Sequence, residues 1–414
     1  MSQNVLAGLD IGSERVTCIV AEVDDQGILQ ITGAGQALTG DSVRSGMIVD
    51  LQGATDAALI AMEEAESLSG WEISDTAVSI SGTHVRGLHG RGTVNIDREG
   101  DLSSGEITWM DIEDALETAQ LIKLPRESMV LRTVKCGYSI DEFERLIKPP
   151  VGLRAERLTA DIYMVTADRS AILNLEQVIQ NTGRKISSIF PAASAGARAV
   201  LTRDEMEIGV ALADIGASTT DIAVFYSGTL AHLAVIPIGG EAITRDLQQL
   251  RIPHSEAERL KKEYSDVSGI EKRGEKSITA STFGGRNSIS ISSEMISGIA
   301  SRRIHELMME IMNEINRAGI QQTDLPAGIV LTGGTSHLMG ITRAASRVTG
   351  LPAEVGTSIG LNMASPLAET PEFATAVGLV LLTREEKSQY EYRKWLNPLE
   401  NTVIRIKGLF NRLR

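Results

Sequence analysis

The sequence predicts a two-lobed α/β protein in which two related halves close on one phosphate chain. Two stretches, Leu6 to Val23 and Val210 to Tyr226, have the same layout: a short apolar strand, an acid, a turn of small residues and a second apolar strand. A third stretch, Gly328 to Ile341, runs from a buried-strand pattern through a Gly-Gly-Thr turn into a helix. Each turn alone is typical of an ordinary sheet, but the three in this order favour a duplicated core around a phosphate site.

The turns predict a clamp for a metal-bound phosphate. Small residues let the backbone approach a ligand closely, and consecutive N–H groups in a turn form a concave anion site. The acid before each turn, Asp10 or Asp214, would repel a phosphate unless a divalent cation lay between them. Mg²⁺ prefers oxygen ligands and keeps several waters, so we expect both acids to face it through water. Asp221 follows on the return strand, where it is placed to position a water; Asp214 and Asp221 are the candidate catalytic residues.

Composition excludes several classes of protein. A chain of 414 residues with 42% hydrophobic and 23% charged residues is typical of a soluble globular protein, and its length predicts roughly two to three domain-sized units. Its 2 cysteines and 6 histidines do not have the spacing of a disulfide scaffold or a zinc site. The formal charge of −14 argues against nucleic acid as a partner. With neither a signal peptide nor a run of about 18 apolar residues, we expect a cytoplasmic, non-spanning chain.

The first half of the chain reads as a core interrupted by an insertion. After the first hairpin and a third strand comes a helix with Asp50 as its N-cap and Gly70 as its stop. A strand follows at Thr76 to Ser81. From about His84 to Tyr163 the pattern changes to a Gly-rich β segment, a helix from Thr108 to Leu121 and two more strands, which we interpret as an inserted α/β subdomain.

The core pattern resumes after Asp168 and leads through the second hairpin to a helix at Ser255 to Tyr264. That helix carries Glu258, Lys261 and Lys262, whose spacing fits either a solvated ion pair or a ligand contact. A Ser-, Thr- and Gly-rich stretch at Ser265 to Ser293 is the least readable part. A long amphipathic helix follows, with two arginines predicted to face outward, and a last core helix opens at a proline.

This order of parts resembles the actin, sugar-kinase and heat-shock-chaperone superfold. In detail it is similar to the FtsA family, bacterial actin-like cell-division proteins that tether the FtsZ ring to membrane. Three features carry the resemblance: the inserted block after Thr76 to Ser81, the VLTGG sequence around Thr332, and a linker that ends in an amphipathic C-terminal helix.

The resemblance implies an actin-like fold with duplicated core domains around a nucleotide cleft. It divides the chain into core subdomain 1A (1–83, 164–195 and 362–383), inserted subdomain 1C (84–163), core subdomain 2A (196–246 and 325–361), subdomain 2B (247–324), a linker (384–398) and an amphipathic membrane-targeting helix (399–414).

The resemblance also implies ATP and Mg²⁺ as cofactors. The residues that match the family's nucleotide motifs, together with the neighbouring third turn, are Asp10, Gly12, Ser13, Arg15, Asp214, Gly216, Ser218, Thr219, Gly239, Gly240, Glu241, Glu258, Lys261, Lys262, Gly333, Gly334 and Thr335. One departure is clear: the family usually has GGGT where this chain has Gly216-Ala217-Ser218-Thr219.

The implied function is that of an adaptor. Such a protein polymerises into actin-like filaments, is at most a weak ATPase, lies on the inner face of the cell membrane at the division septum and helps recruit later division proteins. An FtsZ C-terminal peptide would bind subdomain 2B, with Arg286, Arg302 and Arg303 as the candidate contacts because guanidinium groups pair bidentately with carboxylates.

The C-terminal segment is predicted to lie on an anionic lipid surface. On a helical wheel, residues 399–414 place six apolar side chains on an arc of about 120°, with cations on both flanks. The candidate membrane contacts are Leu399, Val403, Ile406, Lys407, Leu409, Phe410, Arg412, Leu413 and Arg414.

Two alternatives share the phosphate hairpins. A small-molecule kinase of the same superfold would need a carboxylate base over a substrate hydroxyl, and the sequence offers no convincing one. An actin-like pilus-assembly adaptor is not expected to need the membrane helix, so that helix discriminates between the two adaptors.

Overall fold

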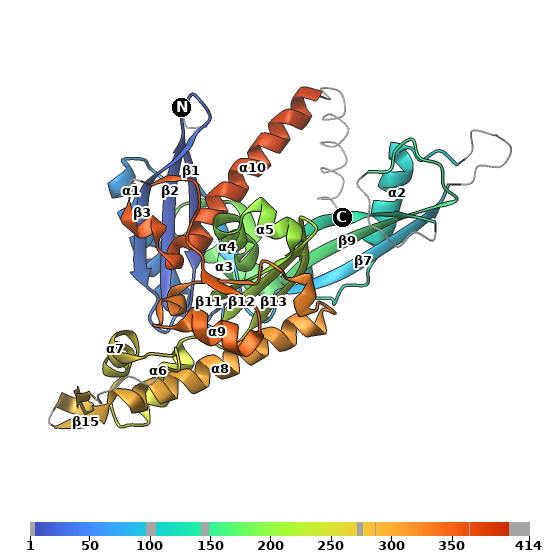
Figure 1. Ribbon diagram of the computed structural model, residues 1–414. Helices are drawn as coiled ribbons and strands as arrows, with labels where there is room; N and C mark the ends of the chain where they lie inside the picture. Colours follow the sequence, from blue (N-terminus) through green and yellow to red (C-terminus); the bar gives the residue numbers. More distant parts are fainter. Residues whose placement is uncertain are drawn as a thin grey trace.

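The computed structural model describes residues 5–96, 105–141, 149–270, 276–285, 287–363 and 365–396. The first lobe is built on a sheet with strand order β10-β6-β1-β2-β3-β18 (Figure 1). In it β1, β2 and β3 form an antiparallel meander, β6 runs parallel to β1, and β10 runs parallel to β6. The strands are β1 (Val5–Ile11), β2 (Arg15–Val23), β3 (Leu29–Leu38), β6 (Asp75–Ile80), β10 (Lys185–Pro191) and β18 (Asn362–Met363).

The second lobe repeats this plan. Its sheet has the order β13-β12-β11-β16-β17, with β11, β12 and β13 as the antiparallel meander and β16 and β17 added in parallel beside β11. The strands are β11 (Val210–Ile215), β12 (Thr220–Tyr226), β13 (Thr229–Ile236), β16 (Ile329–Thr332) and β17 (Ala353–Val355). The predicted duplicated core is therefore confirmed: β1, β2, β3, β6 and β10 correspond to β11, β12, β13, β16 and β17, and β18 is an addition to the first sheet.

Helices pack tightly on the first sheet because small residues line the contacts. Helix α1 (Leu51–Ser69) begins as predicted: the Asp50 side chain accepts a hydrogen bond from the Gln52 N–H, and Gly70 ends the helix with a φ of 73°. Helix α10 (Ala374–Leu396) crosses α4 (Ala192–Val200) so closely that a Cβ on Gly378 would lie 1.7 Å from the Ala195 carbonyl oxygen. Helix α3 (Arg169–Asn181) packs against α1.

The inserted block folds around a core of its own. Strands β7 (Arg86–Asn95), β9 (Arg157–Asp168) and β8 (Ser128–Ile140) form an antiparallel sheet with order β7-β9-β8, covered by α2 (Trp109–Ala119). Thr108 and Asp111 form the predicted capping box at the start of α2. The buried Tyr163 hydroxyl accepts a hydrogen bond from the Leu233 N–H at 2.7 Å, which ties the block to β13.

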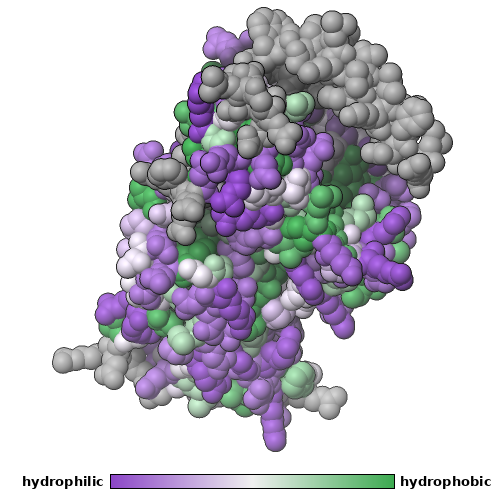
Figure 2. All heavy atoms as spheres, turned by 90° about the vertical axis from the view of Figure 1, so that its right-hand side faces the viewer, coloured by the Kyte–Doolittle hydropathy of each residue, from purple (hydrophilic) through white to green (hydrophobic). Residues whose placement is uncertain are grey.

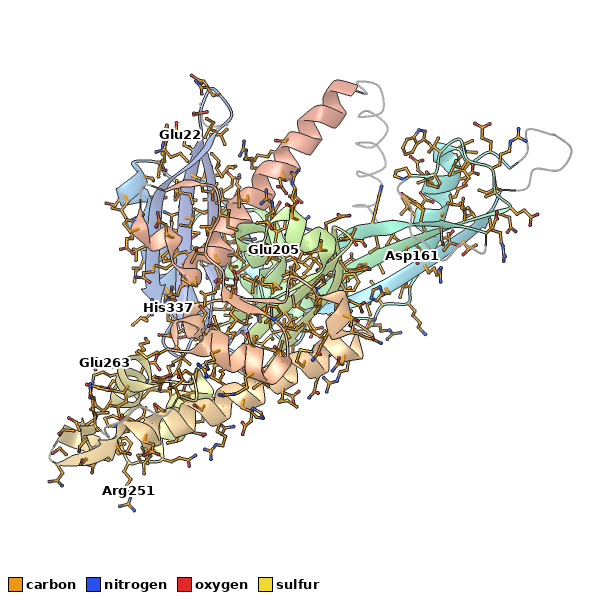
Figure 3. The ribbon with its side chains drawn as sticks, in the orientation of Figure 1. Glu22, Asp161, Glu205, Arg251, Glu263 and His337 are labelled. Carbon is orange, nitrogen blue, oxygen red and sulfur yellow. The ribbon has the colours of Figure 1, made fainter. Side chains whose placement is uncertain are left out.

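The opposite end of the molecule carries α6 (Glu241–Gln248), α7 (His254–Tyr264), the β14 (Ser277–Ser281) and β15 (Ser288–Ser292) hairpin, and α8 (Ser293–Arg317). The Ser-, Thr- and Gly-rich stretch from Ser265 to Ser293 thus contains a short hairpin. Figure 3 places Asp161 in the inserted block and Arg251 and Glu263 at the far end from it. Helix α9 (Ile341–Thr349) packs on α8. The remaining short elements are β4 (Val43–Arg44), β5 (Met47–Ile48), α5 (Arg203–Ile208) and the 3₁₀ turns η1 (Phe283–Gly285), η2 (Gln322–Asp324), η3 (Gly334–His337), η4 (Pro366–Glu369) and η5 (Pro371–Phe373).

Of the expected linker at residues 384–398, the structure describes residues 384–396. Its backbone is helical as far as Leu396, as the second half of α10 (Figure 1). Ion pairs hold the first turn of this extension to the body: Glu385 pairs with Arg198 at 2.6 Å and Glu386 with Arg132 at 2.8 Å. Figure 2 shows a mostly hydrophilic face with hydrophobic residues scattered over it. Within the described parts of the chain, no helix combines the length and apolar character needed to cross a bilayer.

Candidate functional site

The two hairpin tips face one cavity of about 190 Å³ between the lobes. Most of the residues predicted from the sequence line it: Asp10, Gly12, Ser13, Arg15, Asp214, Gly216, Thr219, Asp221, Glu258, Lys261, Lys262, Gly333, Gly334 and Thr335. Four predicted residues, Ser218, Gly239, Gly240 and Glu241, are not among its lining residues. The structure therefore brings together segments that lie far apart in the chain, since Asp10, Gly333 and Glu372 all line this cavity.

The two tips have the same backbone geometry. Gly12 N–H donates to the Arg15 carbonyl at 3.0 Å, and Gly216 N–H donates to the Thr219 carbonyl at 2.9 Å. Among the described residues, the N–H groups of Ser13 and Ala217 have no hydrogen-bond acceptor. Each tip therefore leaves N–H groups available to an anion in the cavity.

The departure from GGGT does not strain the second tip. Neither Ala217 nor Ser218 adopts a positive φ, so their Cβ atoms carry no conformational cost of the kind that favours glycine. Glycine is needed beside the tip instead: a Cβ on Gly239 would lie 2.5 Å from the Ala217 carbonyl oxygen. Gly240 N–H donates to the Gly216 carbonyl at 3.0 Å, and Glu241 N–H to the Ala217 carbonyl at 2.8 Å. Gly239, Gly240 and Glu241 thus support the tip from behind.

Three acids, Asp10, Asp214 and Asp221, lie at the base of the cavity. Each accepts a hydrogen bond from a hydroxyl: from Ser79 at 2.5 Å, Thr375 at 2.8 Å and Ser81 at 2.7 Å, respectively. Burial raises the pKa of Asp10 to about 6, and burial together with the charge of Asp10 raises the pKa of Asp214 to about 7. Burial and the charge of Asp214 hold the pKa of Asp221 well above its usual range.

The chemistry of the three acids fits a compensating divalent cation. Clustered buried carboxylates resist ionising unless a cation compensates them, and these three have hydroxyl partners only. Within the described ranges, no group of three or more His, Cys, Asp or Glu side chains is close enough to hold a metal ion directly. A cation that keeps its water shell would compensate the charge of the three carboxylates and contact them through those waters.

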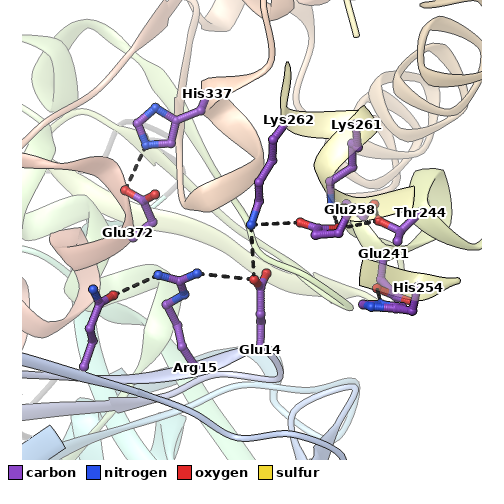
Figure 4. Close-up of polar contacts among 12 residues, drawn as sticks. Glu14, Arg15, Glu241, Thr244, His254, Glu258, Lys261, Lys262, His337 and Glu372 are labelled. Carbon is purple, nitrogen blue, oxygen red and sulfur yellow. Dashed lines mark hydrogen bonds and ion pairs between the residues drawn. The ribbon is translucent and has the colours of Figure 1, made fainter. Parts of the chain in front are cut away.

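One wall of the cavity is made by α7. The Glu258 carboxylate pairs with Lys261 at 2.7 Å and with Lys262 at 3.0 Å, and accepts a hydrogen bond from the Thr244 hydroxyl at 2.7 Å (Figure 4). Burial alone would raise the pKa of Glu258, but these partners, Lys261 first, lower it to about 2. Lys261 is 7% exposed, so it is not part of a solvated surface pair. The structure thus excludes a fully solvated ion pair for this spacing, and contact with a ligand stays a prediction.

The sequence did not single out several cavity residues. Glu14, between the predicted Ser13 and Arg15, pairs with Arg15 at 3.3 Å and reaches across to Lys262 at 3.6 Å (Figure 4). His337 pairs with Glu372 at 2.9 Å on the other side of the cavity. Glu14 lies inside a recognised motif and was within reach of sequence reasoning, whereas the His337 and Glu372 pair joins elements that only the fold brings together.

The arginines proposed for peptide binding differ from one another. Arg303 forms a bidentate pair with Asp246, with Nε to Oδ2 at 2.7 Å and Nη2 to Oδ1 at 2.8 Å. Arg302 makes one longer contact, 3.3 Å, to the same carboxylate, and its side chain is 63% exposed. Arg302 is therefore free to bind a further carboxylate, and Arg303 is largely committed to joining α8 to α6. Arg286 and all nine candidate membrane contacts in 399–414 lie outside the described residues.

Two duplicated α/β lobes around a shared cleft define the actin-like class of proteins. Solved structures agree: a PilM-PilN type IV pilus biogenesis complex matches with a TM-score of 0.63 and 16% identity over 91% of this chain and 98% of that one. MreB5 of Spiroplasma citri bound to ADP matches with a TM-score of 0.55 and 14% identity, over 94% of this chain and 99% of that one. At these identities the likeness shows the fold alone.

Sequence comparison identifies the family within this class. The model for Cell division protein FtsA matches residues 211–378, and the model for the SHS2 domain inserted in FtsA matches residues 82–166. Cell division protein FtsA of Neisseria meningitidis is 35% identical over 91% of this chain and 90% of its own, and that of Pseudomonas aeruginosa is 33% identical over 94% and 91%. The chain belongs to the FtsA family of actin-like cell division proteins, which confirms the resemblance drawn from the sequence.

Proposed function

We propose that this protein binds Mg²⁺-ATP between its lobes, polymerises into actin-like filaments and tethers the FtsZ ring to the inner face of the cell membrane at the division septum. The observation that carries the nucleotide proposal is the pair of equivalent hairpin tips: the N–H groups of Ser13 and Ala217 have no acceptor among the described residues, and both residues line one cavity together with Asp10, Asp214 and Asp221. Family membership supports the cell-division role, including the recruitment of later division proteins.

Different residues of the cleft would contact different parts of the nucleotide. The tip N–H groups beside Ser13 and Ala217 would hold phosphate oxygens. Bound Mg²⁺ would neutralise phosphate charge. Asp10 and Asp214 would orient the water shell of the ion, and Glu258, Lys261 and Lys262 would contact the ribose and base.

The cleft supports slow hydrolysis at most. Asp221 is placed to hold a water, but its second oxygen accepts a hydrogen bond from Ser81 and its pKa is raised well above its usual range. The Ser81 hydroxyl thus occupies one of the two carboxylate oxygens that could accept a proton from an attacking water. Asp214 and Asp221 are therefore proposed as positioning groups of a weak ATPase, and the small-molecule kinase is the less supported alternative.

Subdomain 2B and the C-terminal segment would bind different partners. An acidic FtsZ tail peptide would bind subdomain 2B at Arg302, since Arg302 keeps free donors next to Asp246. The membrane would be met by residues 399–414, beyond the helical extension of α10. Several copies in a filament would then bind membrane with avidity that one copy lacks.

Equilibrium binding tests the nucleotide proposal directly. Titration calorimetry of the full chain with ATP, with and without Mg²⁺, should show saturable binding that needs the metal. Asp214→Ala should weaken that binding and abolish nucleotide-dependent sedimentation of filaments, while circular dichroism and the urea midpoint report the fold. If Asp214→Ala binds Mg²⁺-ATP and sediments as the wild type does, the assignment of the site is wrong.

A further inference from the structure

The outer face of α2, in the inserted block, carries large apolar side chains that the described parts of the chain leave uncovered. Trp109 and Met110, at the start of the helix, are 63% and 59% exposed. Neighbouring apolar side chains that stay exposed mark an interaction site more often than isolated ones do. Glu113 and Glu117 follow Trp109 at intervals of four residues, so these three side chains share one face of the helix.

The acids on this face are unpaired within the described ranges. Glu113, Asp114 and Glu117 are exposed, and none of them forms an ion pair with a described cation. Asp111 on the same helix is different, because it is buried and belongs to the capping box with Thr108. A partner that fits the outer face of α2 therefore needs an apolar surface and positive charge together.

Residues 399–414 of the same chain have this chemistry. Their apolar positions share one arc of a helical wheel, and cations lie on both flanks of that arc. The segment carries a net charge of +3, from Arg405, Lys407, Arg412 and Arg414 against Glu400. In composition it is complementary to the exposed face of α2.

The structure brings the root of this segment to the inserted block. Arg132 on β8 pairs with Glu386 on α10 at 2.8 Å, and its Cζ lies 4.1 Å from the centroid of the Phe190 ring. Leu396 is about 15 Å further along α10 than Glu386, and the chain from residue 397 to residue 414 spans up to about 60 Å when extended. The segment is therefore long enough to return to the block. Figure 1 shows the end of α10 and helix α2 both in the upper part of the molecule.

We propose that residues 399–414 dock on the exposed face of α2 in their own chain, with the apolar arc against Trp109 and Met110 and the cations beside Glu113 and Glu117. In this docked state the apolar arc is covered, so the contact masks the membrane-binding segment until an anionic bilayer competes for it. Only this consequence rests on the proposed function, because the docking itself needs no membrane. A filament, whose copies bind the bilayer together, competes more effectively with the docking than one copy does.

Zero-length crosslinking of the full chain tests the contact directly. A carbodiimide joins a carboxylate to an amine that touches it, and Lys407 is the lysine of the segment. Peptide mapping should recover Lys407 joined to Glu113, Asp114 or Glu117, and an excess of anionic liposomes should lower that yield severalfold. Lys407→Arg keeps the charge and removes the amine, so this control should lose the crosslink.

A mixture of isotope-labelled and unlabelled chains shows whether the contact lies within one chain. Each crosslinked peptide pair should then carry a single label. Pairs that combine both labels would show docking between copies, and a complete lack of crosslinks from Lys407 to α2 would show no docking; either result overturns the proposal.

Affinity for anionic liposomes provides the second readout. Trp109→Ala and Glu113→Gln/Glu117→Gln should each lower the apparent dissociation constant by about threefold, because the apparent affinity is reduced by the fraction of chains whose segment is free. Glu63→Gln/Glu72→Gln removes the same charge from exposed positions of the first lobe and is the matched control, which should leave the constant unchanged.

Unchanged constants in both α2 variants overturn the masking, and weaker binding by Trp109→Ala would show that α2 itself meets lipid, which also overturns it. A full chain that gives the crosslink within one chain but binds no liposomes would support the docking and contradict the proposed membrane attachment. The two failures are therefore distinguishable.

Discussion

Asp214 lies directly opposite Asp221 in the β11–β12 ladder, at the point where both strands reach the cavity. Burial and the charge of Asp214 raise the pKa of Asp221, and the charge of Asp10 raises the pKa of both Asp214 and Asp221. Asp10 of the first lobe and Asp214 and Asp221 of the second lobe thus line the same cavity. The three neighbouring carboxyls therefore disfavour their own ionisation in the nucleotide-free protein. The stability of that protein should depend on pH and on bound cations.

The first prediction is that the nucleotide-free protein loses stability as pH rises through the acids' raised pKa values. A carboxyl with a pKa raised in the folded state contributes stability that is fully present below its unfolded pKa, near 3.8, and lost as pH rises through about 6 for Asp10 and about 7 for Asp214. The slope of the unfolding free energy is at most about 1.4 kcal/mol per pH unit for each such group.

Urea unfolding between pH 5 and pH 8 measures this slope. Asp214→Asn cannot ionise at that position, so its slope should be shallower than that of the wild type, and saturating Mg²⁺-ATP should flatten the wild-type curve. Glu258 serves as a contrast because its lowered pKa, about 2, puts its titration outside this window. Equal slopes for wild type and Asp214→Asn would contradict the electrostatic account of the cleft.

The second prediction separates the two lysines of α7. Lys261 is buried against Glu258, so Lys261→Ala removes the closest partner of a buried carboxylate and should lower the unfolding free energy by about 1–3 kcal/mol. Lys262 is 54% exposed at its side chain, and Lys262→Ala should cost less than about 1 kcal/mol. Both should weaken ATP binding, since both line the cavity. Chemical denaturation measures the unfolding free energies, and calorimetry measures the ATP affinities. A Lys262→Ala variant that is less stable than Lys261→Ala would contradict the predicted order of stabilities.

The third prediction separates Arg302 from Arg303. Arg303→Ala leaves the Asp246 carboxylate with one longer contact, so we expect the unfolding free energy to fall by about 1–2 kcal/mol, because the Arg303 side chain is 36% exposed and solvent screens part of the pair. Arg302→Ala should change stability by less than about 1 kcal/mol but weaken binding of an acidic FtsZ tail peptide. Fluorescence anisotropy of a labelled peptide, with Arg317→Ala as an exposed-arginine control on the same helix, measures the affinity. Unchanged affinity in Arg302→Ala would remove that residue from the peptide site.

Local patterns in the sequence were sufficient to predict the duplicated core. The two hairpins, the Asp50 cap and Gly70 stop of α1, and the capping box at Thr108 are all encoded within a few residues, and the structure contains each of them. Because duplication repeats a local pattern, it is visible without knowledge of contacts between distant segments.

Contacts between distant segments could not be predicted in this way. The pair of His337 with Glu372, the bond from Ser45 to Ser218 and the hydroxyl partners of the three acids join residues on different elements, so no spacing in the chain signals them. The helical extension of α10 was missed for a related reason. A charged segment looks like a tether when its partners, Arg198 and Arg132, lie far away in the sequence.

The last prediction concerns the segment beyond that extension. Residues 399–414 lie outside the described residues. Four cations, Arg405, Lys407, Arg412 and Arg414, stand against one acid, Glu400, so the segment carries +3 in a chain of −14. Electrostatic attraction to an anionic surface contributes about 1 kcal/mol per basic residue, and the apolar face adds to it, while the cost of ordering a short helix offsets part of both.

In a pelleting assay with liposomes that contain anionic lipid, the full chain should therefore bind reversibly, and high salt should weaken it because exposed charges are screened. Deletion of residues 399–414, or Phe410→Glu on the apolar face, should leave the protein in the supernatant. Asn411→Gln, a polar exchange off that face, is the matched control and should pellet as the wild type does. A truncated chain that pellets as strongly as the full chain would show that attachment lies elsewhere, and the proposed link between polymerisation and membrane avidity would have to be sought on the folded body instead.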